Sequence, residues 1–487
     1  MTLRSIIAKD KPIWTAYLFL GVTLILIQLV LVVSVACGKV MLFWGASFFT
    51  ILVLVILNNV DTGLCLLPIV LGTSLMLVPG SRIHMAELVI ALVLLSMIAH
   101  LSTGSKTSLW VFPHKGPILL FLLASVISLS YAHYLGAAIT HVVKLFIAFI
   151  LVFALVYNRV TDDRVLVRAC KGLILAGLVA SIYGLGQYFS AHTPEATLES
   201  ARIFGRAGGL YGGVVGLSLV LLCSYLLFAR AGIEKVLVCI LIIPALSALV
   251  LSHIRAWYLG FLIALIFMGL VKGHQIKRSR PLITIAVIAL AAILLFSGLW
   301  EEVSLAAIEF LFARGLDLPG WGNVLAIGIS VDYSLMARIN IWSFAWRQFL
   351  KYPLTGVGVA NFRISDPFHP HLSEPVAGHA FADNHYINIL VETGILGAVA
   401  WIWLLANLFR SSVRLLRSSR DSDLEWVSVG LVGSLLLFLV GGIFWCLTPL
   451  LNEACLTAFL FSLIFAAQRV RASERPPVSQ MNRCLGG

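Results

Sequence analysis

Apolar stretches long enough to cross a lipid bilayer recur along nearly the whole chain. A bilayer core of about 30 Å requires about 20 helical residues, because each residue of an α-helix rises by about 1.5 Å. Hydrophobic residues make up 60% of the chain, charged residues only 11%, and the mean hydropathy is +1.01. These values exclude a water-soluble domain and predict an all-α, polytopic membrane protein.

Counting apolar runs predicts about fourteen transmembrane helices. The predicted spans are Ile13–Val35, Val40–Leu57, Leu64–Val78, Ala86–Leu101, Pro117–Tyr131, Ala138–Tyr157, Gly172–Phe189, Tyr211–Phe228, Val236–Leu251, Trp257–Val271, Pro281–Leu299, Ile387–Phe409, Val427–Cys446 and Pro449–Ala467.

Four regions follow from this pattern. They are an N-terminal transmembrane bundle over residues 1–299, a long external loop over 300–386, a C-terminal three-helix segment over 387–470 and a tail over 471–487. Lysine and arginine cluster in every second connection, which places both termini on the cytoplasmic side of the membrane. The net charge of +12 is therefore attributed to topology and to anionic lipids, and nucleic acid is not expected as a partner.

Two segments of the long loop have helical spacing: Val303–Ala313 and, nearer the end of the loop, Ser334–Leu350. Ile339, Trp342 and Trp346 recur there at intervals of three and four residues, which favours a helix lying at the membrane interface. Tyr352 and Pro353 should end this helix, and the following Gly356-Val357-Gly358 predicts a tight turn.

Several arginines lie where the positive-inside pattern does not account for them, Arg82 and Arg202 among them. Three others are Arg206, Arg255 and Arg338. A guanidinium group stays charged and presents a planar set of donors that matches phosphate, so the three together would bind a lipid diphosphate. The alternative is that each side chain reaches lipid headgroups or pairs with a carboxylate.

The sequence Asp383-Asn384-His385-Tyr386 stands at the start of the predicted span Ile387–Phe409. A carboxylate and an imidazole next to water at this point would remove a proton from a sugar hydroxyl. The alternative is an ordinary helix cap, in which Asp383 or Asn384 accepts backbone N–H groups. Glu392 follows within the span, where it is expected to have a supporting role, such as holding an arginine. The histidine spacing fits no zinc site, and no metal or other cofactor is expected.

These features together resemble the O-antigen ligase and O-antigen polymerase family of bacterial envelope proteins. The resemblance rests on Arg338 to Trp342, Phe349 to Gly358, Asn361-Phe362, and Asp383-Asn384-His385-Tyr386-Ile387 through Glu392-Thr393-Gly394-Ile395-Leu396-Gly397. It covers roughly residues 205–404.

The resemblance implies a metal-independent, inverting glycosyltransferase of the bacterial inner membrane, which takes a glycan from an undecaprenyl-diphosphate carrier on the periplasmic face. The loop over residues 300–386 is then periplasmic. The acceptor is a glycan or glycolipid, and membrane lipids surround the site. In the ligase motif a histidine thought to be the base precedes the asparagine, whereas Asp383 occupies that position here and His385 follows. Either residue is therefore a candidate base, with Asn384 beside them and Tyr386 and Glu392 in support. Arg206 and Arg255 fall in regions where family members place diphosphate-binding arginines.

Two other readings remain. A lipid-linked oligosaccharide flippase or polysaccharide transporter would line a central path with charge and show matching broken helices in two halves, but the polar residues here concentrate late in the chain. A polyprenyl-phosphate-sugar glycosyltransferase would need acidic residues in the first external connection, which here is only Gly38-Lys39. The sequence leaves polymerase and ligase undecided.

Overall fold

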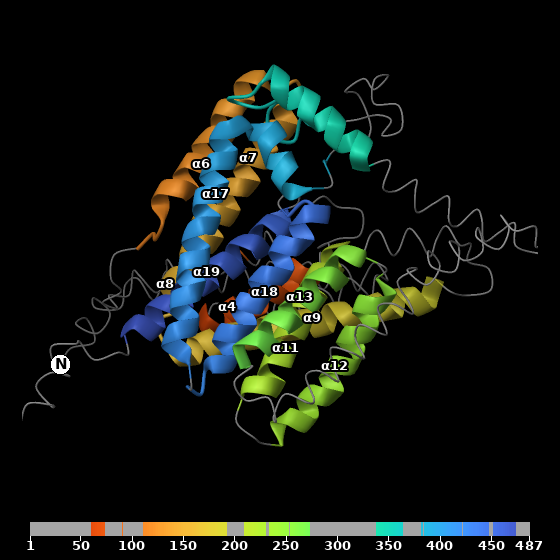
Figure 1. The fold of residues 1–487 in the computed structure, drawn as a ribbon, viewed down its shortest axis with the longest axis vertical. Coiled ribbons are helices and arrows are strands. Elements are labelled where there is room, and N and C mark those ends of the chain that lie inside the picture. The colour runs from red at the N-terminus through yellow and green to blue at the C-terminus, as the bar shows by residue number, and fades with distance from the viewer. Residues whose placement is uncertain are drawn as a thin grey trace, which may run out of the picture.

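The computed structural model describes residues 60–73, 90, 111–191, 209–229, 233–252, 254–272, 338–363, 381–382, 384–420, 422–447 and 451–473. These residues form helices joined by short connections, without any β-strand in the described ranges (Figure 1). The all-α expectation is confirmed for this part of the chain.

The helices match the predicted apolar runs closely. They are α4 (Val60–Thr73), α6 (Lys115–Ile127), α7 (Leu135–Phe146), α8 (Phe153–Arg159), α9 (Asp163–Ala191), α11 (Gly209–Phe228), α12 (Glu234–Leu251), α13 (Arg255–Lys272), α17 (His385–Ser419), α18 (Glu425–Phe444) and α19 (Leu451–Ser473). A 3₁₀ turn, η1 (Ser128–Tyr131), extends α6, and a π-helix, η2 (Ile147–Val152), joins α7 to α8.

Six described helices are long and apolar enough to cross a membrane, and four shorter apolar helices accompany them. The predicted spans Ile13–Val35, Val40–Leu57, Ala86–Leu101 and Pro281–Leu299 lie outside the described residues, apart from the single residue Ile90. The total of about fourteen spans and the periplasmic assignment of the loop therefore stay predictions.

Small residues bring the helices into close contact, as expected where lipid offers no hydrophobic drive for association. A Cβ added at Gly177 of α9 would lie 2.1 Å from Cβ of Ser218 in α11, and one at Gly260 of α13 would lie 2.8 Å from the carbonyl oxygen of Leu437 in α18. One hydrophobic core joins α4–α13 to α17–α19, so the C-terminal helices pack within the bundle and not beside it.

α17 differs from the single straight span predicted over Ile387–Phe409. Gly394 interrupts it with φ 64° and ψ −164°, and the ring centroids of His385 and Trp401 lie only 5.0 Å apart. In a straight helix, sixteen residues would separate these positions by about 24 Å along the axis. The segment 385–393 therefore folds back sharply against the longer segment 395–419.

The two ends of the bundle differ in chemistry. At one end Arg159 pairs with Asp61 at 2.5 Å, and Arg469 donates to the carbonyl oxygens of Tyr157 and Val160 at 2.6 and 2.8 Å. At the other end lie the helix at residues 338–351 and the turn that follows it, beside the end of α6 (Figure 1). The end with Arg159 and Arg469 is called the basic end below, and it lies away from the helix at residues 338–351.

The helix at residues 338–351 confirms the helix expected within Ser334–Leu350 and its end before Pro353. Ile341, Phe344 and Ala345 pack on the protein, whereas Ile339 and Trp346 are 47% and 53% exposed. It is called the interfacial helix below, after its predicted place at the membrane surface, which stays a prediction.

Candidate functional site

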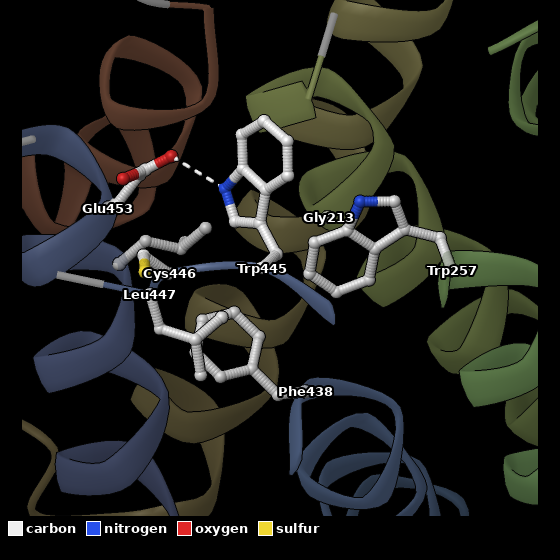
Figure 2. Close-up of a pocket in the computed structure, with 8 residues that line it drawn as sticks. Gly213, Trp257, Phe438, Trp445, Cys446, Leu447 and Glu453 are labelled. Atoms are coloured by element: carbon white, nitrogen blue, oxygen red, sulfur yellow. Dashed lines mark hydrogen bonds between the residues drawn. The ribbon is translucent and has the colours of Figure 1, made fainter. Parts of the chain in front are cut away.

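A small pocket lies where several helix ends meet (Figure 2). Gly213 lies near the start of α11, Trp257 near the start of α13, and Glu453 in the first turn of α19. The remaining lining residues are Phe438, Trp445, Cys446, Leu447 and Leu456. The lining is apolar apart from the carboxylate of Glu453. The starts of α11, α13 and α19 lie around it, and the N-terminal end of a helix carries a partial positive charge.

The indole of Trp257 fills the space between α11, α13 and α18. It is 2% exposed, and a Cβ added at Gly213 or Gly441 would lie 3.1 or 2.3 Å from its ring. The glycines on α11 and α18 therefore make room for an indole that fixes the start of α13. In Figure 2 this ring faces Trp445, whose Nε1 donates to the carboxylate of Glu453 at 3.1 Å.

His385 adjoins the pocket through Leu447. The main-chain N–H of Leu447 donates to Nδ1 of His385 at 3.3 Å, and the imidazole packs edge-on against Trp401. Its side chain is 0% exposed, which differs from the expected water-facing histidine. The cause is the fold-back at Gly394, which turns the start of α17 inward against its own second segment.

The neighbours of His385 have structural contacts. Oδ1 of Asn384 accepts from the N–H groups of Tyr386 and Ile387 at 3.0 and 3.1 Å, so Asn384 is the N-cap of α17. The Tyr386 hydroxyl donates to the carbonyl oxygen of Leu439 in α18 at 2.8 Å. The cap interpretation is thus confirmed for Asn384, and Tyr386 ties the first segment of α17 to α18.

Arg338 approaches the same region from the interfacial helix. Its guanidinium carbon lies 6.0 Å from the ring centroid of Phe444, directly before the lining residues Trp445–Leu447. The segment 444–447 therefore adjoins Arg338, His385 and, across the pocket, the start of α13. Arg206, Asp383 and the side chain of Arg255 lie outside the described residues, although Arg255 is the first residue of α13.

The carboxylate of Glu392 is buried beside the backbone of Ala360 and Phe362 and the side chain of Asn388, and Oε1 has no hydrogen-bond partner among the described residues. No arginine side chain that the structure describes pairs with it, so the expected arginine partner stays a prediction. Asn388 was not singled out from the sequence, because one asparagine in an apolar run gives no distinctive signal.

The turn after the interfacial helix fills the break in α17. The N–H groups of Val357 and Gly358 donate to the carbonyl oxygens of Val391 and Glu392 at 2.9 and 3.1 Å, and Ile395 N–H donates to the carbonyl oxygen of Pro353 at 2.9 Å. Gly356 and Gly358 have φ of 72° and 97°, which confirms the predicted tight turn. Polar groups exposed by the break are thereby satisfied, as a membrane environment demands.

Part of the chain is similar to a known protein family. Residues 237–402 match the family model described as O-antigen ligase, a range that runs from α12 through the interfacial helix into α17. It contains Arg255, Arg338 and residues 383–392, whereas Arg206 lies before it. No curated protein matches the chain.

Proposed function

Because this chain carries an O-antigen ligase domain over residues 237–402, and is thereby a membrane protein of polysaccharide biosynthesis, we propose that it is a metal-independent, inverting glycosyltransferase. It moves a glycan from an undecaprenyl-diphosphate carrier to an acceptor sugar on the periplasmic face. The observation that carries the proposal is the position of Arg338 beside Phe444, next to the segment 445–447 and the starts of α13 and α19. Positive helix ends and a guanidinium group together suit a diphosphate.

In the proposed reaction the acceptor hydroxyl oxygen attacks the anomeric carbon, and the bond from that carbon to the diphosphate oxygen breaks. Asp383 takes the hydroxyl proton, and the departing undecaprenyl diphosphate carries the bond's electron pair. Arg206, Arg255 and Arg338 stabilise the negative charge that grows on the leaving group. Inversion follows because the hydroxyl and the leaving group occupy opposite faces of the sugar.

The contacts of His385 support Asp383 as the base. Nδ1 of His385 already accepts a hydrogen bond from Leu447, and the ring is fully buried against Trp401. A general base must lie within hydrogen-bonding reach of the proton that it removes. His385 is therefore assigned to positioning the start of α17 and Asp383 to proton removal.

The turn that fills the break in α17 argues against a transporter. Broken helices in transporters leave main-chain groups free to bind ions or substrate, but Val391, Glu392 and Ile395 are bonded here to the turn at residues 353–358. The break thus serves to dock the interfacial helix, which fits an enzyme with a surface site.

The test uses proteoliposomes that hold the purified protein and lipid-linked glycan on one leaflet only. We expect transfer to an acceptor on the same leaflet without translocation of the donor, and loss of transfer in Asp383→Asn. Movement of the donor to the other leaflet without transfer would contradict the proposal and favour the flippase.

Deleting the gene separates the two transfer reactions that the family contains. Surface glycans of the deletion strain are run on a gel. Loss of the ladder with a single repeat still attached to its anchor identifies a polymerase, and loss of every attached glycan identifies a ligase.

A further inference from the structure

Ala382, which directly precedes Asp383, has both of its main-chain polar groups bonded to side chains from different helices. Its carbonyl oxygen accepts from Nε1 of Trp342 at 3.0 Å, and its N–H donates to Oδ1 of Asn388 at 3.1 Å. Trp342 belongs to the interfacial helix and Asn388 to the folded-back segment of α17. Ala382 itself is 0% exposed, so neither bond is exchanged for water.

Asn388 has a buried neighbour on its other side. Its side chain lies beside the carboxylate of Glu392, which also adjoins the backbone of Ala360 and Phe362. The exposed fractions of Asn388 and Glu392 are 6% and 4%. Asn388 thus lies in a closely packed place, and two hydrogen bonds join it through Ala382 to Trp342 of the interfacial helix.

The chain on the far side of Asp383 is fixed too, because Asn384 caps α17 through its side chain. We propose that Asn388 is a positioning residue for glycan transfer: by holding Ala382 it sets the place of the carboxylate that follows, relative to the diphosphate-binding arginines. This inference rests on the proposed function. Asn388 touches no substrate and acts through Ala382.

The consequence is a specific kinetic signature. A displacement of about 1 Å in a reacting group lowers the rate of the chemical step by about 100-fold, because reaction depends on near-attack geometry. Binding of the lipid diphosphate does not require that geometry. Loss of the bond between Asn388 and Ala382 should therefore lower kcat and leave KM for the donor nearly unchanged.

The variant Asn388→Leu removes the acceptor for Ala382, whereas Asn388→Asp keeps an oxygen at that place and shares a proton with Glu392. Trp342→Phe removes the other bond to Ala382 and retains an aromatic ring on the interfacial helix. Donor for the assay is the lipid-linked glycan that accumulates in the deletion strain, incorporated with each full-length variant into proteoliposomes.

Asn158→Leu is the matched control. The amide of Asn158 also bridges main-chain groups, bonding the N–H and carbonyl oxygen of Val111 at 2.9 and 3.0 Å. It lies at the end of α8, which adjoins the basic end of the bundle. A general loss of stability from removing a bridging asparagine would appear in both leucine variants.

We expect kcat to fall about 100-fold in Asn388→Leu and about tenfold in Trp342→Phe, with donor KM within about threefold of wild type. Asn388→Asp should recover at least about tenfold over Asn388→Leu, and Asn158→Leu should retain wild-type kcat. Equal losses in the two Asn388 variants, or a kcat within about threefold of wild type in Trp342→Phe, overturn the proposal. If Asn388→Leu does not fold, the kcat of Trp342→Phe decides the proposal.

Failure of this inference and failure of the proposed function give different results. An inactive Asp383→Asn beside fully active Asn388→Leu and Trp342→Phe removes the role of Asn388 and leaves the enzyme. A fully active Asp383→Asn removes the proposed base, whatever the Asn388 variants do.

Discussion

The main-chain N–H of Leu447 and Nδ1 of His385 lie 3.3 Å apart and form a hydrogen bond. This bond joins the start of α17 to the connection between α18 and α19, next to the pocket at Trp257 and Trp445. With Nδ1 accepting, the neutral ring carries its proton on Nε2, and Nδ1 is not free to take one from a substrate. The bond therefore favours a positioning role for His385 and leaves proton removal to Asp383.

The substitutions His385→Asn and His385→Leu test whether His385 positions α17 or removes the proton. In His385→Asn the side-chain oxygen replaces Nδ1 as the acceptor for Leu447, so transfer should stay within about tenfold of wild type, with an unchanged pH profile. In His385→Leu the buried N–H of Leu447 loses its acceptor, at a cost of about 1–3 kcal/mol in unfolding free energy. Initial rates against pH and thermal melting measure the two effects.

Asp383→Asn is the comparison for both variants. Loss of a general base lowers the rate by about 10²- to 10⁴-fold, and we expect that loss at position 383. If His385→Asn lost that much while Asp383→Asn kept its activity, the two assignments would have to be exchanged.

Glu392 gives a second test, because an acceptor of backbone N–H groups and a partner of an arginine respond differently to loss of charge. Glu392→Gln keeps a side-chain oxygen beside the backbone of Ala360 and Phe362, so folding and transfer should change little. Glu392→Leu removes every acceptor from this buried position and should lower the unfolding free energy by about 2–4 kcal/mol. The yield of folded protein in detergent and the melting temperature provide the measurement. A Gln variant as unstable as the Leu variant would restore the arginine interpretation.

Much of the helical framework was predictable, since apolar runs such as Val236–Leu251 and Val427–Cys446 need only bilayer thickness and composition for their recognition. Local signals also identify the helix at residues 338–351, its end at Tyr352-Pro353 and the turn at Gly356–Gly358. Asn384 was correctly offered as a cap, because capping depends on residues that are adjacent in the chain.

The fold-back of α17 was not predictable in the same way. Glycine is common in transmembrane helices, so Gly394 alone does not distinguish a break from a close helix contact. What decides it is the turn at residues 353–358, which supplies hydrogen bonds to Val391 and Ile395 from a distant part of the sequence. The burial of His385 and the bridging role of Asn388 both follow from this tertiary contact.

Gly394→Ala tests the break directly. Gly394 has φ 64°, and a Cβ there would lie 2.4 Å from the carbonyl carbon of Leu354. Both the left-handed conformation and the contact with main chain oppose a side chain, so we expect a loss of about 2–4 kcal/mol in unfolding free energy. Gly184→Ala in α9 is the control, because no atom lies within 4 Å of its added Cβ. Similar melting temperatures for the two variants would mean that the break does not depend on the turn.

Arg338 and Arg347 provide a matched pair for the diphosphate site. Both lie on the helix at residues 338–351, but Arg338 approaches Phe444 beside the pocket, whereas Arg347 lies 5.9 Å from the ring of Phe344 on its own helix. Removing either charge has the same effect on the attraction of this helix to anionic lipid. Only the loss of Arg338 should raise KM for the lipid-diphosphate donor, by about tenfold, since one charge-assisted hydrogen bond contributes about 1.5–3 kcal/mol. Steady-state transfer by Arg338→Ala and Arg347→Ala in the same proteoliposomes gives the comparison. Equal changes in donor KM would assign Arg338 to the lipid surface and leave the diphosphate to other groups.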